Sequence, residues 1–159
     1  ALPKWIGLAM KENERYRKMS LISAEEFTRR FLSLVLNSTQ LPKKAADLHI
    51  LLYSAILDLE PARSYTEKEI NAQLQAWCLR FGQTMGLDHV TLRRALVDEG
   101  FIQRDPSGNH YFVNLDALPV QFDPTIRTLD LVALTTRAIE EKEQRKQEFL
   151  RRAKEHPPH

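Results

Sequence analysis

Apolar residues recur at the spacing of an α-helix in four consecutive stretches of this 159-residue chain. In the first stretch, Phe27, Phe31 and Val35 follow one another at i, i+4 and i+8, which places them on one face of a helix. Pro42 is expected in the first turn of the second stretch, and Pro61 follows its end. The four predicted helices cover residues 23–37, 42–59, 66–82 and 88–99. The pattern predicts a mainly helical protein.

Capping signals mark where three of these helices begin. Ser23 is followed three residues later by Glu26, and Thr66 is followed in the same way by Glu69. This spacing is that of a capping box, in which a hydroxyl and a carboxyl group satisfy free backbone N–H groups. Asp88 is predicted to cap the fourth helix.

A short hairpin is predicted directly after the fourth helix. Gly100 is placed to end that helix in a left-handed conformation. The runs 101–102 and 110–113 are aromatic or β-branched and flank an Asp-Pro-Ser-Gly turn, in which Gly108 takes the position that needs a positive φ. From residue 42 the order is helix, extended link, helix, turn, helix and hairpin, which is that of a winged helix-turn-helix. The predicted fold class is therefore α+β, mainly helical, with a winged helix-turn-helix core and flanking N- and C-terminal helices.

Two flanking regions complete the predicted organisation. Residues 114–127 contain two prolines and are expected to form an extended connection, and the last helix is predicted to start near Thr128 or Asp130. Residues 1–20 are either a docking arm or a frayed helix. The predicted divisions are an N-terminal arm and helix (1–38), a winged-helix-like domain (39–114), and a linker with the C-terminal helix (115–159).

The last helix changes character along its length. Residues 129–139 are too apolar for an exposed helix, whereas residues 140–155 are mostly charged and are expected to be solvated. We expect the apolar half to be covered, either by the helix over residues 23–37 or by a second subunit in a homodimer.

Composition argues against several classes of protein. The single cysteine, Cys78, excludes an internal disulfide, and no apolar run approaches the ~20 residues of a membrane span. We therefore expect a cytoplasmic protein without a membrane partner. The net charge of +2 gives no strong overall field, so a DNA-binding surface would depend on local charge placement.

No motif of a known catalytic or cofactor site is present. The chain lacks nucleotide-binding glycine loops, a nucleophile elbow and a zinc-protease motif, and its five histidines show no ligand spacing. Cys78 lies on an apolar helical face, where a thiol is more often a packing group than a nucleophile. We expect no enzyme activity, no catalytic residue, no metal site and no cofactor.

The helix over residues 88–99 is the candidate DNA-reading helix. With about 100° per residue, Leu92 and Leu96 fall on its docking face, while Val90, Thr91 and Arg94 fall on the opposite side. An arginine there can read a guanine edge, and polar groups of the hairpin can reach phosphates or the minor groove. The candidate DNA-binding residues are Val90, Thr91, Arg93, Arg94, Arg104, Ser107, Asn109 and His110.

Structural roles compete with DNA contact at these positions. Arg94 and Asp98 are spaced i, i+4 and can pair on the helix surface. Arg93 or Arg94 can instead reach Glu69 on the preceding helix and brace the domain. His110 is more typical of a solvent-facing strand residue than of a catalytic base.

Two motifs give the chain a resemblance to a known family. They are Tyr-Thr-Glu-Lys-Glu-Ile-Asn over residues 65–71 and Leu-Arg-Arg-Ala-Leu-Val-Asp over residues 92–98, and the similarity extends over about residues 41–113. The chain resembles an uncharacterised bacterial domain of unknown function, found alone or fused to helix-turn-helix domains of the arsenic-repressor type in regulators of transcription. The resemblance implies a winged-helix-like domain with a regulatory association.

These observations lead to two hypotheses from different classes. The first is a regulatory protein of transcription or stress response that binds double-stranded DNA with the helix over 88–99 and the hairpin over 101–113. The alternative is a winged-helix module that binds a protein partner without direct DNA binding. The arginine pair and the hairpin favour DNA, and the weak charge favours a protein partner.

Overall fold

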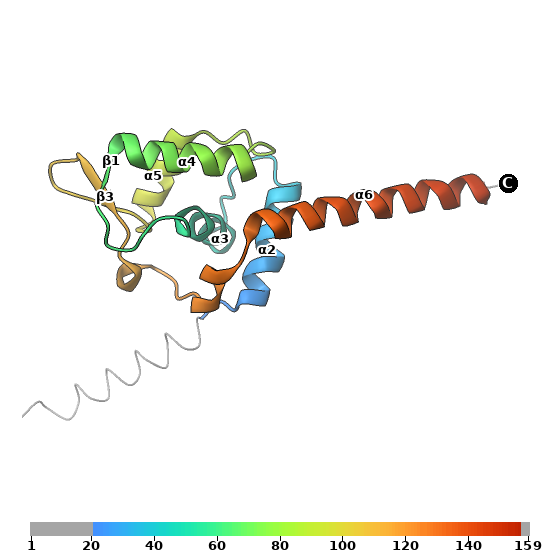
Figure 1. Ribbon diagram of the computed structural model, residues 1–159, viewed down its shortest axis with the longest axis horizontal. Helices are drawn as coiled ribbons and strands as arrows, with labels where there is room; N and C mark the ends of the chain where they lie inside the picture. The colour runs from blue at the N-terminus through green and yellow to red at the C-terminus, as the bar shows by residue number, and fades with distance from the viewer. Residues whose placement is uncertain (1–20, 157–159) are drawn as a thin grey trace, which may run out of the picture. The chain divides into compact units, whose positions relative to one another are not determined.

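The computed structural model describes residues 21–156 (Figure 1). They belong to two compact units, one that ends at Thr128 and one that begins at Leu129. The helices of the first unit are α2 (Ala24–Asn37), α3 (Ala45–Ile56), α4 (Glu67–Phe81) and α5 (His89–Asp98). Its strands are β1 (Tyr65–Thr66), β2 (Gln103–Arg104) and β3 (His110–Phe112). The predicted α+β, mainly helical class is confirmed, and the predictions for residues 1–20 lie outside the described residues.

Helix α3 is the centre of the first unit. Residues 50–56 are all buried, and α3 packs against α2 on one side and α5 on another. Tyr53 of α3 stacks on Phe122, with ring centroids 3.8 Å apart, and Phe27 and Phe31 of α2 join the same aromatic cluster. Large aromatic side chains bury much apolar surface, so this cluster joins α2 and α3 to the chain after the sheet.

The predicted helix caps are present. The Ser23 hydroxyl accepts the Glu26 N–H, and the Asp88 carboxylate accepts the Thr91 N–H at 2.7 Å. Thr66 and Glu69 form a complete capping box, in which each side chain accepts the other residue's backbone N–H. These bonds lower the pKa of the Glu69 carboxyl group, because they favour its charged form.

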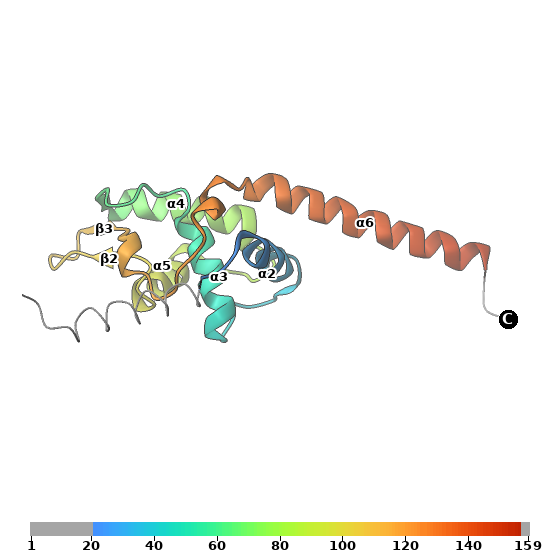
Figure 2. The ribbon, with the colours of Figure 1, turned by 90° about the horizontal axis from the view of Figure 1, so that it is seen from below.

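The three strands form one antiparallel sheet in the order β1–β3–β2. Tyr111 in the central strand lies opposite Tyr65 of β1 and opposite Arg104 of β2. Figure 2 shows β2 and β3 side by side, next to α5. Because Tyr111 is only 2% exposed, the hairpin is attached to the body of the unit and does not stand free in solvent.

Two boundaries differ from the sequence prediction. Pro42 does not lie in the first turn of α3, because Lys44 is extended and the first helical bond runs from the Leu48 N–H to the Lys44 carbonyl. The first hairpin strand is not residues 101–102 but β2. Both N–H groups of Phe101 and Ile102 donate to the Leu96 carbonyl, which wraps these residues around the end of α5.

The expected extended connection over residues 114–127 is partly helical. Two 3₁₀ helices occupy Leu115–Ala117 and Pro124–Thr128, because Asn114 and Asp123 each accept the N–H two residues onward. Between them the chain forms a parallel bridge to Ile22, with two hydrogen bonds of 2.9 Å. The connection is therefore fastened to the segment that precedes α2.

The second unit contains one helix, α6 (Leu131–Glu155), which begins where the sequence predicted. Asp130 accepts the Ala133 N–H, and Glu148 pairs with Arg151 and Arg152 at 2.6 and 3.2 Å. Phe149 is 71% exposed. The cover expected for residues 129–139 and the three-part division of the chain stay predictions. Among the described helices, none combines the length and the apolar character that a membrane crossing requires.

Candidate nucleic-acid interface

Helix α5 presents the two faces that its sequence predicts. Leu92 and Leu96 are fully buried and dock the helix on the unit. Val90, Thr91 and Arg94 are exposed, and 43% of the surface of Val90 is accessible to solvent. The docking of the two leucines therefore fixes which side chains are available to a partner.

Arg93 braces α5 to α4. Its Nη1 donates to Asn71 Oδ1 at 2.5 Å and lies 3.3 Å from Glu67 Oε1, and only 20% of its side chain is exposed. A brace to Glu69 was one of the predicted alternatives, but Glu69 is engaged with Thr66 and Arg63. Arg93 therefore joins α5 to the first turns of α4 through Glu67 and Asn71.

Arg94, the next residue, is free of such contacts. It makes no hydrogen bond and no ion pair with any residue from 21 to 156. Neither of the two predicted braces, to Asp98 and to Glu69, is formed. Its guanidinium group is therefore available to bind a ligand.

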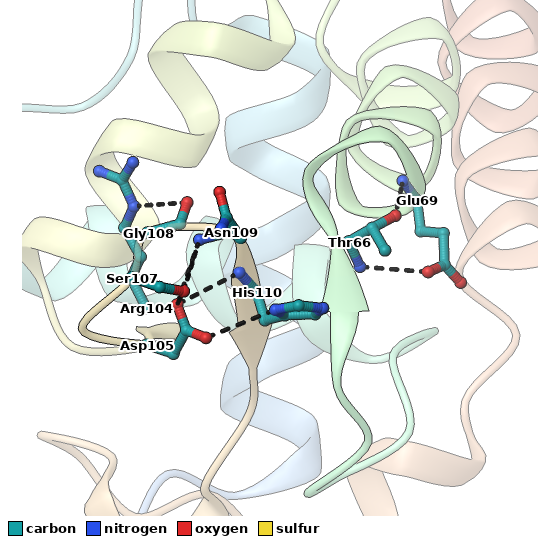
Figure 3. Close-up of polar contacts among 8 residues, drawn as sticks. All are labelled: Thr66, Glu69, Arg104, Asp105, Ser107, Gly108, Asn109 and His110. Carbon is teal, nitrogen blue, oxygen red and sulfur yellow. Dashed lines mark hydrogen bonds and ion pairs between the residues drawn. The ribbon is translucent and has the colours of Figure 1, made fainter.

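Asp105 organises the hairpin turn (Figure 3). Its Oδ1 accepts the Ser107 hydroxyl at 2.8 Å and the Asn109 N–H at 3.1 Å, and its Oδ2 lies 3.4 Å from His110 Nδ1. The bond from Ser107, followed by the backbone N–H groups of the turn, lowers the pKa of this carboxyl group. The side chains of Ser107 and His110 are thus engaged within the turn.

Arg104 lies across the same turn. Its Nε donates to the Gly108 carbonyl at 3.2 Å (Figure 3). Its Cζ lies 5.7 Å from the centre of the Tyr111 ring. The Cζ of Arg93 lies 5.8 Å from the centre of that ring. Tyr111 therefore lies within cation–π distance of two arginines that come from different elements.

A polar recess joins α5 to the hairpin. It has a volume of about 240 Å³, and three arginines and one carboxylate are among the side chains that line it. Its lining residues are Val90, Arg93, Arg94, Val97, Asp98, Arg104 and Tyr111. We name this space the arginine recess.

Four of the eight predicted DNA-binding residues line the arginine recess. Val90, Arg93, Arg94 and Arg104 line it, whereas the other four predicted residues do not. Those four are Thr91, Ser107, Asn109 and His110. The sequence prediction omitted Tyr111, which the structure buries between the exposed His110 and the half-buried Phe112. Alternation along a strand places Tyr111 on the opposite face from its two neighbours.

A second recess is lined by the end of α4, the α4–α5 turn and the start of α5, and it is mainly apolar. It has a volume of about 400 Å³, and Cys78, Leu79 and Leu87 are among its lining residues. Burial raises the pKa of the Cys78 thiol to about 11, so this thiol is protonated at neutral pH. Within residues 21–156, no three His, Cys, Asp or Glu side chains gather as a metal site requires.

Comparison with known proteins covers the part of the chain that holds the recess. Residues 38–113 are similar to a family described as an uncharacterized protein conserved in bacteria (DUF2087). No curated protein and no solved structure matches the chain. The similarity spans α3 to β3 and thus includes every residue of the arginine recess.

Proposed function

We propose that this protein is a regulator of transcription or stress response that binds duplex DNA with α5 and the β2–β3 hairpin. The observation that carries the proposal is the arginine recess, because it places Arg93, Arg94 and Arg104 along one continuous surface. Arginine is the side chain best suited to bind both phosphate oxygens and guanine edges.

The order of elements supports a winged helix-turn-helix interpretation. Helices α3, α4 and α5 are followed by a hairpin, and β1 joins that hairpin from the link between α3 and α4. In this class of fold the third helix enters the major groove and the hairpin contacts the DNA backbone beside it. The buried Leu92 and Leu96 leave the outer face of α5 free for that position.

Each candidate residue then takes a role that fits its surroundings. Val90, Thr91 and Arg94 contact base edges, since all three are exposed on α5. Arg104 and Asn109 contact the DNA backbone from the hairpin. Three further candidates, Arg93, Ser107 and His110, chiefly hold the surface in shape through Glu67, Asn71 and Asp105.

A protein partner is the second candidate. Leu79 on α4 is 70% exposed beside the apolar recess, and an exposed leucine next to an apolar hollow is typical of a surface that docks a side chain of another protein. This surface is separate from the arginine recess, so the two candidates predict different sensitive residues.

A salt titration of DNA binding tests the first candidate. Fluorescence anisotropy with duplex fragments from the source genome should give an affinity that falls with salt, with a log–log slope of about −0.9 for each phosphate contacted. Replacing both Arg94 and Arg104 by alanine should abolish binding, whereas Arg80→Ala, on an exposed arginine that pairs with Asp58, should leave it intact. Absence of binding at about 50 mM salt would refute the proposal.

We also propose that the protein is a homodimer that pairs through α6. Ile139, Phe149 and Leu150 are all more than half exposed on this helix, and a second copy would cover them. A two-fold dimer matches a palindromic DNA site. Light scattering at micromolar concentration should give twice the chain mass of 18.5 kDa, and a monomer would refute the dimer.

A further inference from the structure

Arg104 is held in place by two separate contacts. Its Nε donates to the Gly108 carbonyl at 3.2 Å, and its Cζ lies 5.7 Å from the centre of the Tyr111 ring. The end of the side chain also lies over Gly108, because a Cβ atom added at residue 108 would be 2.8 Å from Arg104 Nη2. An exposed arginine normally samples many rotamers, so these contacts reduce the entropy that it loses on binding.

Gly108 has a backbone conformation that favours glycine, and its Cα also faces the movable end of the Arg104 side chain. Its φ of +76° is a conformation that most residues avoid. The space above its Cα is also occupied by the guanidinium group of Arg104. Gly100, with a φ of +81°, has the first constraint alone, because no atom lies within 4 Å of the Cβ that a substitution would add.

The outer donors of Arg104 remain unused. Within residues 21–156, neither Nη1 nor Nη2 of this side chain makes a hydrogen bond or an ion pair. Arg104 lines a recess together with Arg93 and Arg94, and Asp98 is the one carboxylate among the lining residues of that recess. A fork of two N–H donors matches the oxygens of a carboxylate or a phosphate, and the further positive charge of Arg93 and Arg94 favours the phosphate, which carries more negative charge.

We propose that the arginine recess binds a single phosphate group, with Arg104 as the residue that contacts it and Gly108 as the residue that positions Arg104. The phosphate belongs either to the DNA backbone, in which case the inference rests on the proposed function, or to a free phosphate or nucleotide. The chemistry of recognition is the same for both sources.

The first experiment uses inorganic phosphate and the full chain. Phosphate is titrated at constant ionic strength against chloride, and the backbone ¹⁵N–¹H signals of the β2–β3 hairpin, which every variant retains, report binding. Saturable binding is expected in the wild type and in Arg80→Gln, and it should be lost in Arg104→Gln. A wild type that shows no saturable change, or an Arg104→Gln variant that binds phosphate as well as the wild type, overturns the proposal.

The role of Gly108 is tested with asparagine, which tolerates a positive φ but carries a Cβ atom. Gly108→Asn should displace the flexible end of Arg104 and weaken phosphate binding by about tenfold, since one charge-assisted contact is lost. Gly100→Asn is the matched control and should bind like the wild type. If both variants bind phosphate equally well, Gly108 does not position Arg104. If Gly108→Asn does not fold, the Arg104→Gln result decides the matter.

A parallel DNA titration separates this inference from the proposed function. In Arg104→Gln the salt slope for DNA should become shallower by about 0.9, which corresponds to one lost phosphate contact. Phosphate binding without DNA binding would support the recess and refute the DNA-binding function. DNA binding with an unchanged slope in Arg104→Gln would refute the recess as a phosphate site and leave the function standing.

Discussion

The two sides of α5 differ in what their arginines do, although these arginines are neighbours in the sequence. On the side toward α4, Arg93 is four-fifths buried and bonded to Asn71 and Glu67. On the outer side, Arg94 has no partner among the described residues and lines an open recess. Adjacent residues of an α-helix are rotated by about 100° around its axis. This rotation makes Arg93 a brace between two helices and leaves the guanidinium group of Arg94 without a partner among the described residues.

The difference follows from how the leucines dock the helix. With Leu92 and Leu96 turned into the core, residue 93 must lie beside α4. There Glu67 and Asn71, spaced i, i+4, face the same direction and supply two acceptors to one guanidinium group. A count of positive charges in α5 therefore overstates the charge that is available to DNA.

The largest effect is expected when one of the two leucines that dock α5 is shortened. Leu96→Ala deletes a fully buried side chain, and the free energy of unfolding should fall by about 2–5 kcal/mol. Denaturant unfolding followed by circular dichroism measures this loss. DNA affinity per folded molecule should remain close to that of the wild type, and a large loss of affinity in fully folded Leu96→Ala would show that the two sides are not independent.

Arg94→Ala tests the outer side. If Arg94 contacts a base, the variant should lose about 1–3 kcal/mol of specific binding and relax the sequence preference at one position. The free energy of unfolding should change by no more than about 0.5 kcal/mol, because the side chain is exposed and without a partner. Parallel measurements of melting temperature and DNA affinity separate the two effects.

Thr91→Ala is the control for Arg94 on the same exposed face. It removes a hydroxyl group and no charge, and its backbone N–H still bonds to Asp88. A partial loss of DNA affinity is expected. A large drop in the melting temperature of Arg94→Ala, together with normal binding by the folded fraction, would place Arg94 among the structural residues.

Arg93→Ala tests the inner side and should show the opposite pattern. Removing the guanidinium group leaves Asn71 and Glu67 without their partner, which should cost about 1–2 kcal/mol of stability. A double-mutant cycle with Asn71→Ala isolates the pairwise contribution. Independent, additive losses in the cycle would contradict the brace.

Local features of this fold could be predicted from the sequence because each depends on a few neighbouring residues. The caps at Ser23, Thr66 and Asp88 and the positive φ of Gly100 and Gly108 all belong to this group. The division of α5 into a docking face and an outer face also follows from helical spacing alone.

Features that depend on contacts between distant residues could not be predicted in the same way. The bond between Arg93 and Asn71 joins residues 22 positions apart, and the ring of Tyr111 is shared by arginines of two elements. The hairpin strand was placed two residues early, because the sequence does not reveal that Phe101 and Ile102 bond to the end of α5. Four of the eight predicted site residues line the arginine recess, and their role stays a prediction. A brace from Arg93 to the preceding helix was one of the predicted alternatives, but its partners Asn71 and Glu67 and the ring of Tyr111 were not predicted.

The smallest effect on stability is expected from a fall in pH. It acts on Asp105, which lies in the same hairpin as Arg104. The pKa of Asp105 is lowered in the folded chain, chiefly by the bond from Ser107, so this carboxylate stabilises the turn above its unfolded pKa of about 3.9. That contribution is lost as the pH falls through the lower, folded pKa. Glu69 and Asp88, whose pKa values are also lowered by capping bonds, titrate in the same direction.

The contribution of Asp105 to the pH dependence of stability is obtained by comparing the melting temperatures of the wild type and Asp105→Asn. The melting temperature of the wild type should exceed that of the variant at pH 7, and the difference should shrink toward zero as the pH is lowered through the folded pKa of Asp105. The caps are present in both proteins and cancel in this comparison. Because Asp105 also orders the backbone N–H groups of Asn109 and His110, the variant should loosen the turn that carries Gly108 and weaken DNA binding slightly at neutral pH. A difference in melting temperature that grows toward acid pH would show that Asp105 is stabilised in its protonated form, contrary to the hydrogen bonds that it accepts.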